Sequence, residues 1–178
     1  MKRYLLYILL ICIMLHSCND NKVTAVVSTT NQKNNTAKED SFIQGNKNIV
    51  MLESEEIDLF VKRYEWKVVQ MGTGLRMETV NKTSGIMPKE GNSISLKYKT
   101  MLLTGEVVYS SDELGEKSFV VDKSSEISSL HEAVKKMRVG EKARLVIPSH
   151  LAYGVAGDGN LIKGYTPIAM YVELTDIK

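Results

Sequence analysis

Cysteine is scarce in this chain of 178 residues, and its scarcity restricts both disulfide bonding and metal binding. The two cysteines are Cys12 and Cys18, and Cys12 lies within an N-terminal apolar run that would be removed if the run is a signal peptide. One remaining thiol excludes an intramolecular disulfide. The sequence also shows no convergent set of cysteine, histidine and carboxylate residues of the kind that binds a metal ion.

The chain also has few histidines and a low net charge, and both restrict its possible functions. Beyond Cys18 the chain has only His131 and His150, and we expect His131 to be exposed on a helix, where a lone histidine is seldom a catalytic base. The formal net charge is +2 with scattered lysines, so no basic face for nucleic acid is indicated. Gly72-Thr73-Gly74 precedes no helical pattern and is a weak phosphate-loop motif, and Asp158-Gly159-Asn160 lacks the further carboxylates of a calcium loop.

The N-terminus has the pattern of a lipoprotein signal. Lys2 and Arg3 precede an apolar run over residues 5–15, which is shorter than the about 20 residues needed to span a membrane. The run ends in Leu15-His16-Ser17-Cys18, which matches a bacterial lipobox. We therefore predict a signal peptide over 1–17, acylation of Cys18 with palmitate-type chains, and attachment to the cell envelope at the periplasmic face of the outer membrane. An ordinary signal peptide with a chance cysteine is the alternative.

Two further segments precede the main domain. Residues 18–48 are rich in Asn, Thr, Ser and Lys, which predicts a disordered tether because too little apolar area is available to offset the ordering entropy. Residues 49–65 form a predicted helical extension, with a helix over 54–64 that begins at Ser54 as N-cap. Its apolar stripe comprises Ile57, Phe60, Val61 and Tyr64. The stripe favours packing on the domain's own core over a dimer contact.

From residue 66 onward the pattern is mainly that of short strands. Alternating or apolar segments occur at 66–71, 75–80, 93–102, 106–109, 117–121, 143–147 and 168–174. One helix interrupts them, with Ser129 as the expected N-cap and Glu132 completing a capping box. Its buried stripe is expected to be Leu130, Ala133, Val134 and Met137. The predicted fold class is α+β, a curved antiparallel sheet wrapped over one short helix.

A candidate pocket follows from one loop. Pro148 ends the strand over 143–147, and Tyr153 then precedes Gly154 in a glycine-rich loop. A tyrosine at such a junction offers an apolar ring to line a pocket and a hydroxyl to bind a carbonyl. The sequence therefore indicates an apolar concavity between helix and sheet, with tyrosines at its rim.

Several motifs in order carry a family resemblance. They are ISLKYKTMLLTGEVVYSS (94–111), SSLHEAVKKM (128–137) followed by VGEKARLVIP (139–148), LAYG (151–154) and MYVEL (170–174). In these motifs residues 66–178 resemble an FKBP-type peptidyl-prolyl cis–trans isomerase domain. With the lipobox and the Asn-rich segment, the whole chain is further similar to the FKBP-like lipoprotein associated with gliding motility in Bacteroidetes-type bacteria.

The resemblance implies rotation about X-Pro amide bonds in proline-containing segments of envelope or secreted proteins, with no cofactor. It assigns catalytic roles to Tyr153, whose hydroxyl would bind a substrate carbonyl, to the backbone N–H of Ile127, and to Tyr98. The substrate-binding residues that it implies are Val108, Tyr109, Leu130, Leu161, Ile162 and Met170. It indicates a membrane contact only through the lipid, no nucleic-acid partner and no particular oligomeric state.

The sequence departs from the family pattern inside this pocket. Aromatic residues of the best-known members are replaced by Val108, Lys117, Leu130 and Met170, and their aspartate is replaced by Tyr109. These departures leave open a second hypothesis, a catalytically weak FKBP-fold binding module or chaperone that could form part of an envelope or gliding machine. A glycan-binding lipoprotein is a third and weaker alternative, because the sequence suggests no exposed aromatic platform.

Overall fold

The computed structural model describes the backbone of residues 27–178 and the side chains from residue 44 onward. The chain divides into two compact units, Met1–Gly45 and Asn46–Lys178. The predicted signal peptide and Cys18 lie outside the described residues. In residues 27–178 no helix has both the length and the hydrophobicity that a membrane crossing requires.

The first described element is α2, Val27–Arg63, which is far longer than the helix predicted from the sequence. The prediction of a disordered tether was wrong for residues 27–48, which are helical, whereas residues 18–26 are not described. The first half of α2 has no apolar stripe, so hydrophobic periodicity could not reveal it. Ser54 is accordingly inside the helix and does not cap it, and its hydroxyl accepts a hydrogen bond from Arg76 (3.1 Å).

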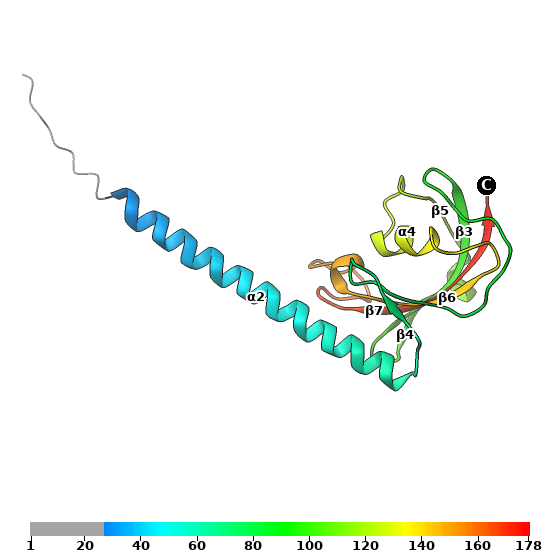
Figure 1. Cartoon of the computed structure of the whole chain (residues 1–178), viewed down its shortest axis with the longest axis horizontal. Coiled ribbons are helices and arrows are strands. Elements are labelled where there is room, and N and C mark those ends of the chain that lie inside the picture. The colour runs from blue at the N-terminus through cyan, green and yellow to red at the C-terminus, as the bar shows by residue number, and fades with distance from the viewer. Residues whose placement is uncertain (1–26) are drawn as a thin grey trace, which may run out of the picture. The chain divides into compact units, whose positions relative to one another are not determined.

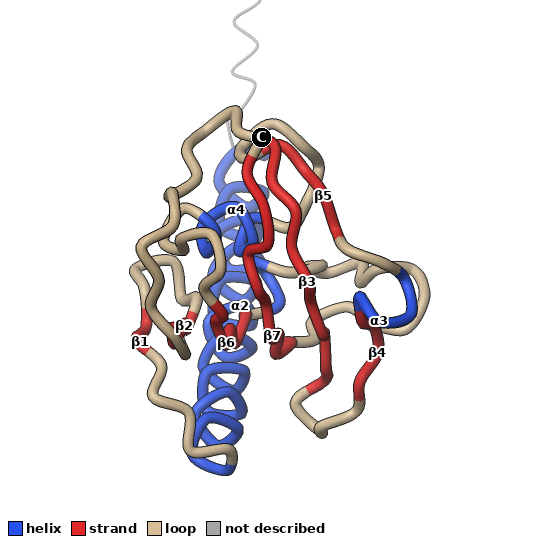
Figure 2. Tube along the Cα trace, turned by 90° about the vertical axis from the view of Figure 1, so that its right-hand side faces the viewer, coloured by secondary structure: helices blue, strands red, loops and turns tan. Residues whose placement is uncertain are grey.

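The remaining chain forms one antiparallel sheet, as predicted. Its strands are β1 (Val69–Gln70), β2 (Arg76–Thr79), β3 (Ser93–Leu102), β4 (Val107–Ser110), β5 (Lys117–Val120), β6 (Lys142–Ile147) and β7 (Ile168–Ile177). They lie side by side in the order β1-β2-β6-β7-β3-β4, with β5 also paired to β3 (Figure 2). The strand predicted over 66–71 is reduced to β1, and β7 continues three residues beyond its predicted end.

One face of the sheet is covered by the short helix α4, Ser128–Val134 (Figure 1). The predicted stripe of this helix is confirmed, because Leu130, Ala133, Val134 and Met137 are fully buried against the sheet. The predicted capping box is wrong. Ile127 occupies the N-cap position, the Ser129 hydroxyl is buried in the first turn, and Glu132 accepts a hydrogen bond from Thr73 (2.8 Å).

The opposite face of the sheet is covered by the last turns of α2. Ile57 and Phe60 are almost completely buried there with Trp66, which confirms that this stripe packs on the domain's own core. The Trp66 ring meets the Phe60 ring edge-on, with centroids 5.2 Å apart. Arg76 of β2 also pairs with Asp58 of the helix at 2.7 Å. The second half of α2 is therefore part of the folded domain.

The feature that positions the pocket is the divided edge of β3. The first half of β3 pairs with β5 and the second half with β4, and the four-residue helix α3 (Ser111–Leu114) lies in the chain between these two strands. Tyr98 lies where neither partner strand is paired, and its N–H donates to the Ser111 hydroxyl instead (3.2 Å). The sheet therefore opens beside Tyr98.

Candidate functional site

A cavity of about 230 Å³ opens at this divided edge. It lies among β3, β4, α3, β5, the N-terminus of α4, the loop after β6 and the first half of β7. Its lining comprises Tyr98, Thr100, Tyr109, Leu114, Lys117, Glu126, Ile127, Leu130, Tyr153, Asp158 and Met170. Six of the nine pocket residues expected from the resemblance are in this set, and their roles remain predictions.

The floor of the cavity is largely apolar. Leu130 reaches it from α4, and Met170 from β7 lies directly opposite Thr100 of β3 in the sheet register. All three side chains are at least 98% buried. A group that enters the cavity therefore leaves water and contacts apolar atoms.

Tyr153 stands at the rim, in the turn that follows the short 3₁₀ helix Ser149–Leu151. The turn is closed by the Gly154 N–H, which donates to the Ser149 carbonyl (2.8 Å). Burial, followed by the nearby carboxylates of Glu126 and Asp158, raises the pKa of Tyr153 to about 12. The hydroxyl therefore keeps its proton at neutral pH and can donate a hydrogen bond.

Tyr109 and Asp158 form a polar pair across the cavity mouth. The Tyr109 hydroxyl donates to one carboxylate oxygen of Asp158, and the other oxygen accepts from the N–H groups of Asn160 (2.8 Å) and Ile162 (2.9 Å). Burial alone would raise the pKa of Asp158, but these hydrogen bonds outweigh burial and lower it. The same hydrogen bond and burial raise the pKa of Tyr109.

Asp158 is a site residue that sequence reasoning missed. The motif Asp158-Gly159-Asn160 was considered only as a calcium loop, whereas the aspartate closes a local turn and faces the pocket. Gly157 makes this possible, because its φ is +74° and a Cβ there would lie 2.3 Å from the Ile162 carbonyl oxygen. The close approach of these two backbone segments brings Asp158 beside Tyr109.

The Ile127 amide, which the resemblance assigns to substrate binding, already has a partner. Its N–H donates to one carboxylate oxygen of Glu126 (3.0 Å), and the other oxygen accepts from Lys117 Nζ (2.6 Å). The same Lys117 nitrogen lies 5.4 Å from the centre of the Tyr98 ring. The pocket thus contains a Lys117–Glu126 ion pair. The glutamate of this pair also accepts the hydrogen bond from the amide that is expected to bind substrate. Sequence reasoning did not single out Glu126, because a lone glutamate in a loop carries no pattern.

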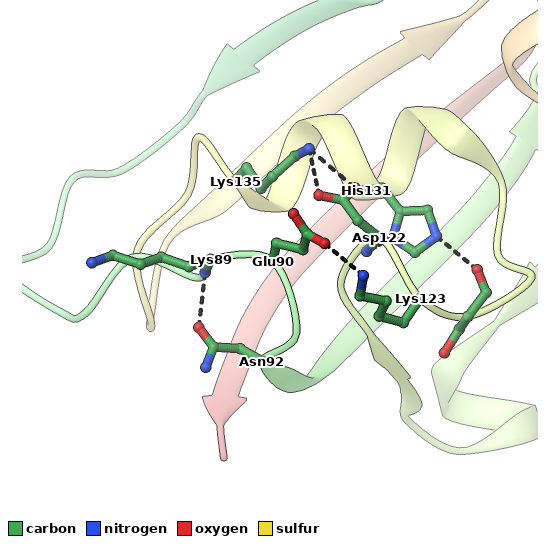
Figure 3. Close-up of polar contacts among 8 residues, drawn as sticks. Lys89, Glu90, Asn92, Asp122, Lys123, His131 and Lys135 are labelled. Carbon is green, nitrogen blue, oxygen red and sulfur yellow. Dashed lines mark hydrogen bonds and ion pairs between the residues drawn. The ribbon is translucent and has the colours of Figure 1, made fainter.

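The loop that carries Glu126 and Ile127 is held by His131, as Figure 3 shows in part. The N–H of Asp122 donates to His131 Nδ1 (3.0 Å), and His131 Nε2 lies 3.1 Å from the Ser124 carbonyl, to which it donates. Lys135 adds two contacts to the Asp122 carboxylate (3.0 and 2.8 Å). The expectation that His131 is exposed was wrong. His131 is 8% exposed, and its ring provides the hydrogen-bond partners that the Asp122 N–H and the Ser124 carbonyl need.

Three expected substrate-binding residues do not line the cavity. Ile162 is a fully buried core residue whose N–H holds Asp158, and Leu161 beside it is 50% exposed. Val108 is half-buried and packs against the main core. The described residues contain no group of three or more His, Cys, Asp or Glu side chains placed to hold a metal ion.

A curved antiparallel sheet over one short helix, with a cavity that has an apolar floor and tyrosine hydroxyls at its rim, defines a small domain suited to an apolar group and a few directed hydrogen bonds. Residues 85–175, just over half of the chain, match the family model described as FKBP-type peptidyl-prolyl cis-trans isomerase. The chain belongs to this family.

Curated relatives agree with this assignment. The chain is 36% identical over 111 residues to the macrophage infectivity potentiator of Trypanosoma cruzi, which covers 62% of this chain and 56% of that protein. It is 31% identical over 107 residues to FK506-binding protein 1A of Neurospora crassa, a match that covers 59% of this chain and 89% of that protein. It is 36% identical over 107 residues to the isomerase FkpA of Escherichia coli K12, a match that covers 60% of this chain and 38% of that protein. The match thus spans about half of the first relative.

Solved structures confirm the fold. A peptidyl-prolyl cis–trans isomerase from Pseudomonas syringae superposes with a TM-score of 0.61 at 28% identity, covering 74% of this chain and 95% of that one. FkpA from Escherichia coli superposes with a TM-score of 0.63 at 26% identity, covering 100% of this chain and 82% of that one. The FKBP-like fold predicted from the sequence is confirmed.

Proposed function

We propose that this chain is a peptidyl-prolyl cis–trans isomerase that acts on X-Pro bonds in protein segments. The observation that carries the proposal is the convergence of the protonated Tyr153 hydroxyl and the N-terminus of α4 on one cavity with an apolar floor. The cavity lies inside the part of the chain that matches the isomerase family. Proline-containing segments of proteins are the substrate class.

The physical basis of catalysis is the difference between the planar and the twisted amide. Uncatalysed isomerisation takes about 10–100 s because the barrier is near 20 kcal/mol. Twisting breaks the amide resonance and makes the group less polar, so a dry cavity favours the twisted state over the planar one. A barrier lowered by about 4 kcal/mol gives a roughly thousandfold faster reaction. No proton transfer is needed.

Each part of the cavity has a role in this mechanism. Leu130 and Met170 provide the apolar floor for the proline ring, with the Tyr98 ring beside them. The Tyr153 hydroxyl donates to a substrate carbonyl and fixes the segment at the rim. The Ile127 N–H binds a second carbonyl once Glu126 has moved away from it.

The direct test is cis/trans exchange of a short Leu-Pro peptide, measured by NMR with a sub-stoichiometric amount of the purified protein. The expected result is exchange that accelerates in proportion to protein concentration. A folded sample that leaves the exchange rate unchanged would overturn the proposal.

One observation favours a second function, that of a prolyl-peptide binding module with weak catalysis. Glu126 occupies the Ile127 amide and is itself held by Lys117, so part of the binding energy of a substrate is consumed in displacing it. Such a protein would bind proline segments in an NMR titration yet accelerate their exchange only slightly. The same exchange experiment separates the two functions.

We further propose that the protein is a lipoprotein, anchored through Cys18 to the periplasmic face of the outer membrane, where it assists folding of envelope or secreted proteins. Support comes from the sequence Leu15-His16-Ser17-Cys18 after an apolar run. A role in a gliding-motility machine is a narrower form of this proposal and rests on sequence resemblance. In the native host, Cys18→Ala is expected to move the folded protein out of the membrane fraction. A variant that still sediments with membranes would contradict lipid anchoring.

A further inference from the structure

The cavity has two carboxylates in its lining, those of Glu126 and Asp158, above a largely apolar floor. Lys117 and Glu126 form their ion pair at 2.6 Å, with side chains only 27% and 15% exposed. At that degree of burial the pair is screened less by salt than a surface pair. Asp158 is the second carboxylate, and the Tyr109 hydroxyl is its side-chain partner within the cavity.

The charges around the cavity do not cancel. Among the described lining residues, Lys117 is the one cation and the carboxylates of Glu126 and Asp158 are the two anions. The Tyr109 hydroxyl that binds Asp158 is neutral, so it satisfies a hydrogen bond without neutralising the charge. The field of these two carboxylates is felt at Tyr153, whose pKa both of them raise, after burial. A cationic group brought to the mouth is therefore attracted, and an anionic group is repelled.

The contacts of Glu126 in the free protein compete with substrate binding at the Ile127 amide. In the free protein one of its oxygens accepts from the Ile127 N–H at 3.0 Å and the other from Lys117. A substrate carbonyl that takes the Ile127 N–H leaves the first oxygen without that donor, at the edge of the bound segment. A buried carboxylate oxygen that loses its donor is costly, and a new donor from the substrate removes that cost.

We propose that Glu126 determines the substrate specificity of this site. Glu126 accepts from the Ile127 amide until a substrate carbonyl replaces it. The carboxylate oxygen that is then free selects proline segments with a lysine or arginine next to the proline. This proposal rests on the proposed isomerase function and names its substrate class. Segments with an acidic residue in the same place face two carboxylates and are disfavoured.

The test uses two series of short peptides, in which the residue before or after proline is Lys, Gln or Glu. Both kcat/KM, from cis/trans exchange, and the dissociation constant, from NMR titration, are measured with the purified protein at low salt. In at least one series the lysine peptide is expected to exceed the glutamate peptide by about tenfold in kcat/KM, with glutamine between them. The ratio is expected to fall toward one at 1 M salt, where screening acts over about 3 Å.

Two variants isolate Glu126. Glu126→Gln keeps the size of the side chain and removes its charge, so the preference for lysine over glutamate is expected to shrink to about twofold, the remainder arising from Asp158. Glu126→Ala also frees the Ile127 amide and is expected to raise kcat/KM for the glutamine peptide roughly fivefold. Glu106→Gln, at an exposed position between β3 and β4, is the matched control and should keep the wild-type ratio.

The outcomes separate this proposal from the function on which it rests. Turnover without a charge preference, or a preference unchanged in Glu126→Gln, overturns the role of Glu126 and leaves the isomerase standing. Binding that ranks lysine above glutamate without turnover overturns the isomerase and supports the selectivity. Absence of both binding and turnover in the wild-type protein overturns both. Because the salt series uses wild-type protein, it still tests the charge preference on which the proposal depends if a variant fails to fold.

Discussion

At the scale of single residues, the chemistry of the site depends on which hydroxyls and carboxylates keep their protons. Tyr153 retains its proton because burial and two neighbouring carboxylates disfavour the phenolate. Asp158 stays ionised because hydrogen bonds outweigh its burial. One donor and one anion therefore line the same cavity.

Tyr153→Phe removes the donor and leaves the ring. Because a hydrogen bond of this kind contributes about 0.5–1.5 kcal/mol, kcat/KM for a Leu-Pro peptide is expected to fall by roughly two- to twelvefold. Peptide exchange by NMR measures the change. Tyr64→Phe, in the turn just after α2 and outside the cavity, is the control and should match the wild type. Unchanged turnover in Tyr153→Phe would show that the family's role for this hydroxyl does not transfer.

Asp158→Asn tests the polar pair at the mouth through the pH dependence of stability. The folded-state pKa of Asp158 lies below its ordinary value of 3.8, so its ionised form stabilises the fold above about pH 4. That contribution is lost as the pH falls through the folded pKa. The difference in Tm between wild type and Asp158→Asn is therefore expected to shrink between pH 5 and pH 2. Asp176→Asn, at an exposed position, should show no such change, and a constant difference for Asp158→Asn would contradict the assignment.

At the scale of elements, the sheet could be predicted because its strands alternate. Leu145 and Ile147 in β6, and Met170 and Leu174 in β7, face the α4 side as expected. The first half of α2 could not be predicted, because its sequence has no apolar side to reveal the helical period.

The candidate site was predictable only in part, for a similar reason. Tyr153, Leu130 and Met170 lie within motifs with a regular pattern, so the resemblance placed them on the cavity. Glu126 and Asp158 reach it through loop geometry, which depends on His131 below one loop and on the close backbone contact at Gly157 in the other. Such tertiary contacts leave no periodic trace in the sequence.

The end of α2 offers a direct comparison of two adjacent residues. Phe60 is 1% exposed between the helix and the sheet, whereas Leu59 is 62% exposed on the outer side. Phe60→Ala is expected to lower the free energy of unfolding by about 3–5 kcal/mol, because it leaves a cavity beside Trp66. Leu59→Ala should change it by about 0.5 kcal/mol or less. Urea unfolding followed by Trp66 fluorescence measures both. Equal effects would mean that this turn of α2 does not pack on the sheet.

At the scale of the whole molecule, the unit Asn46–Lys178 contains both core clusters, whose buried residues begin at Ile57. A protein that begins at Asn46 is therefore expected to fold and to keep the isomerase activity of the longer chain within about twofold. Far-UV circular dichroism, Tm and peptide exchange check this. Deletion through Arg63 removes Ile57 and Phe60 and should lower the Tm strongly. A shortened protein from Asn46 that does not fold would show that residues before it are needed.

The strands at the outer sides of the sheet are short. β1 has two residues, and β4 and β5 have four each, with these last two sharing one side of the ten-residue β3. Within residues 27–178 the long strands β3 and β7 are thus flanked on both sides except where β3 opens beside Tyr98, so most of their backbone groups are closed to a strand from another chain. The proposed clients are incompletely folded chains, which expose unpaired strands. A protein built in this way can work among such chains without seeding their aggregation.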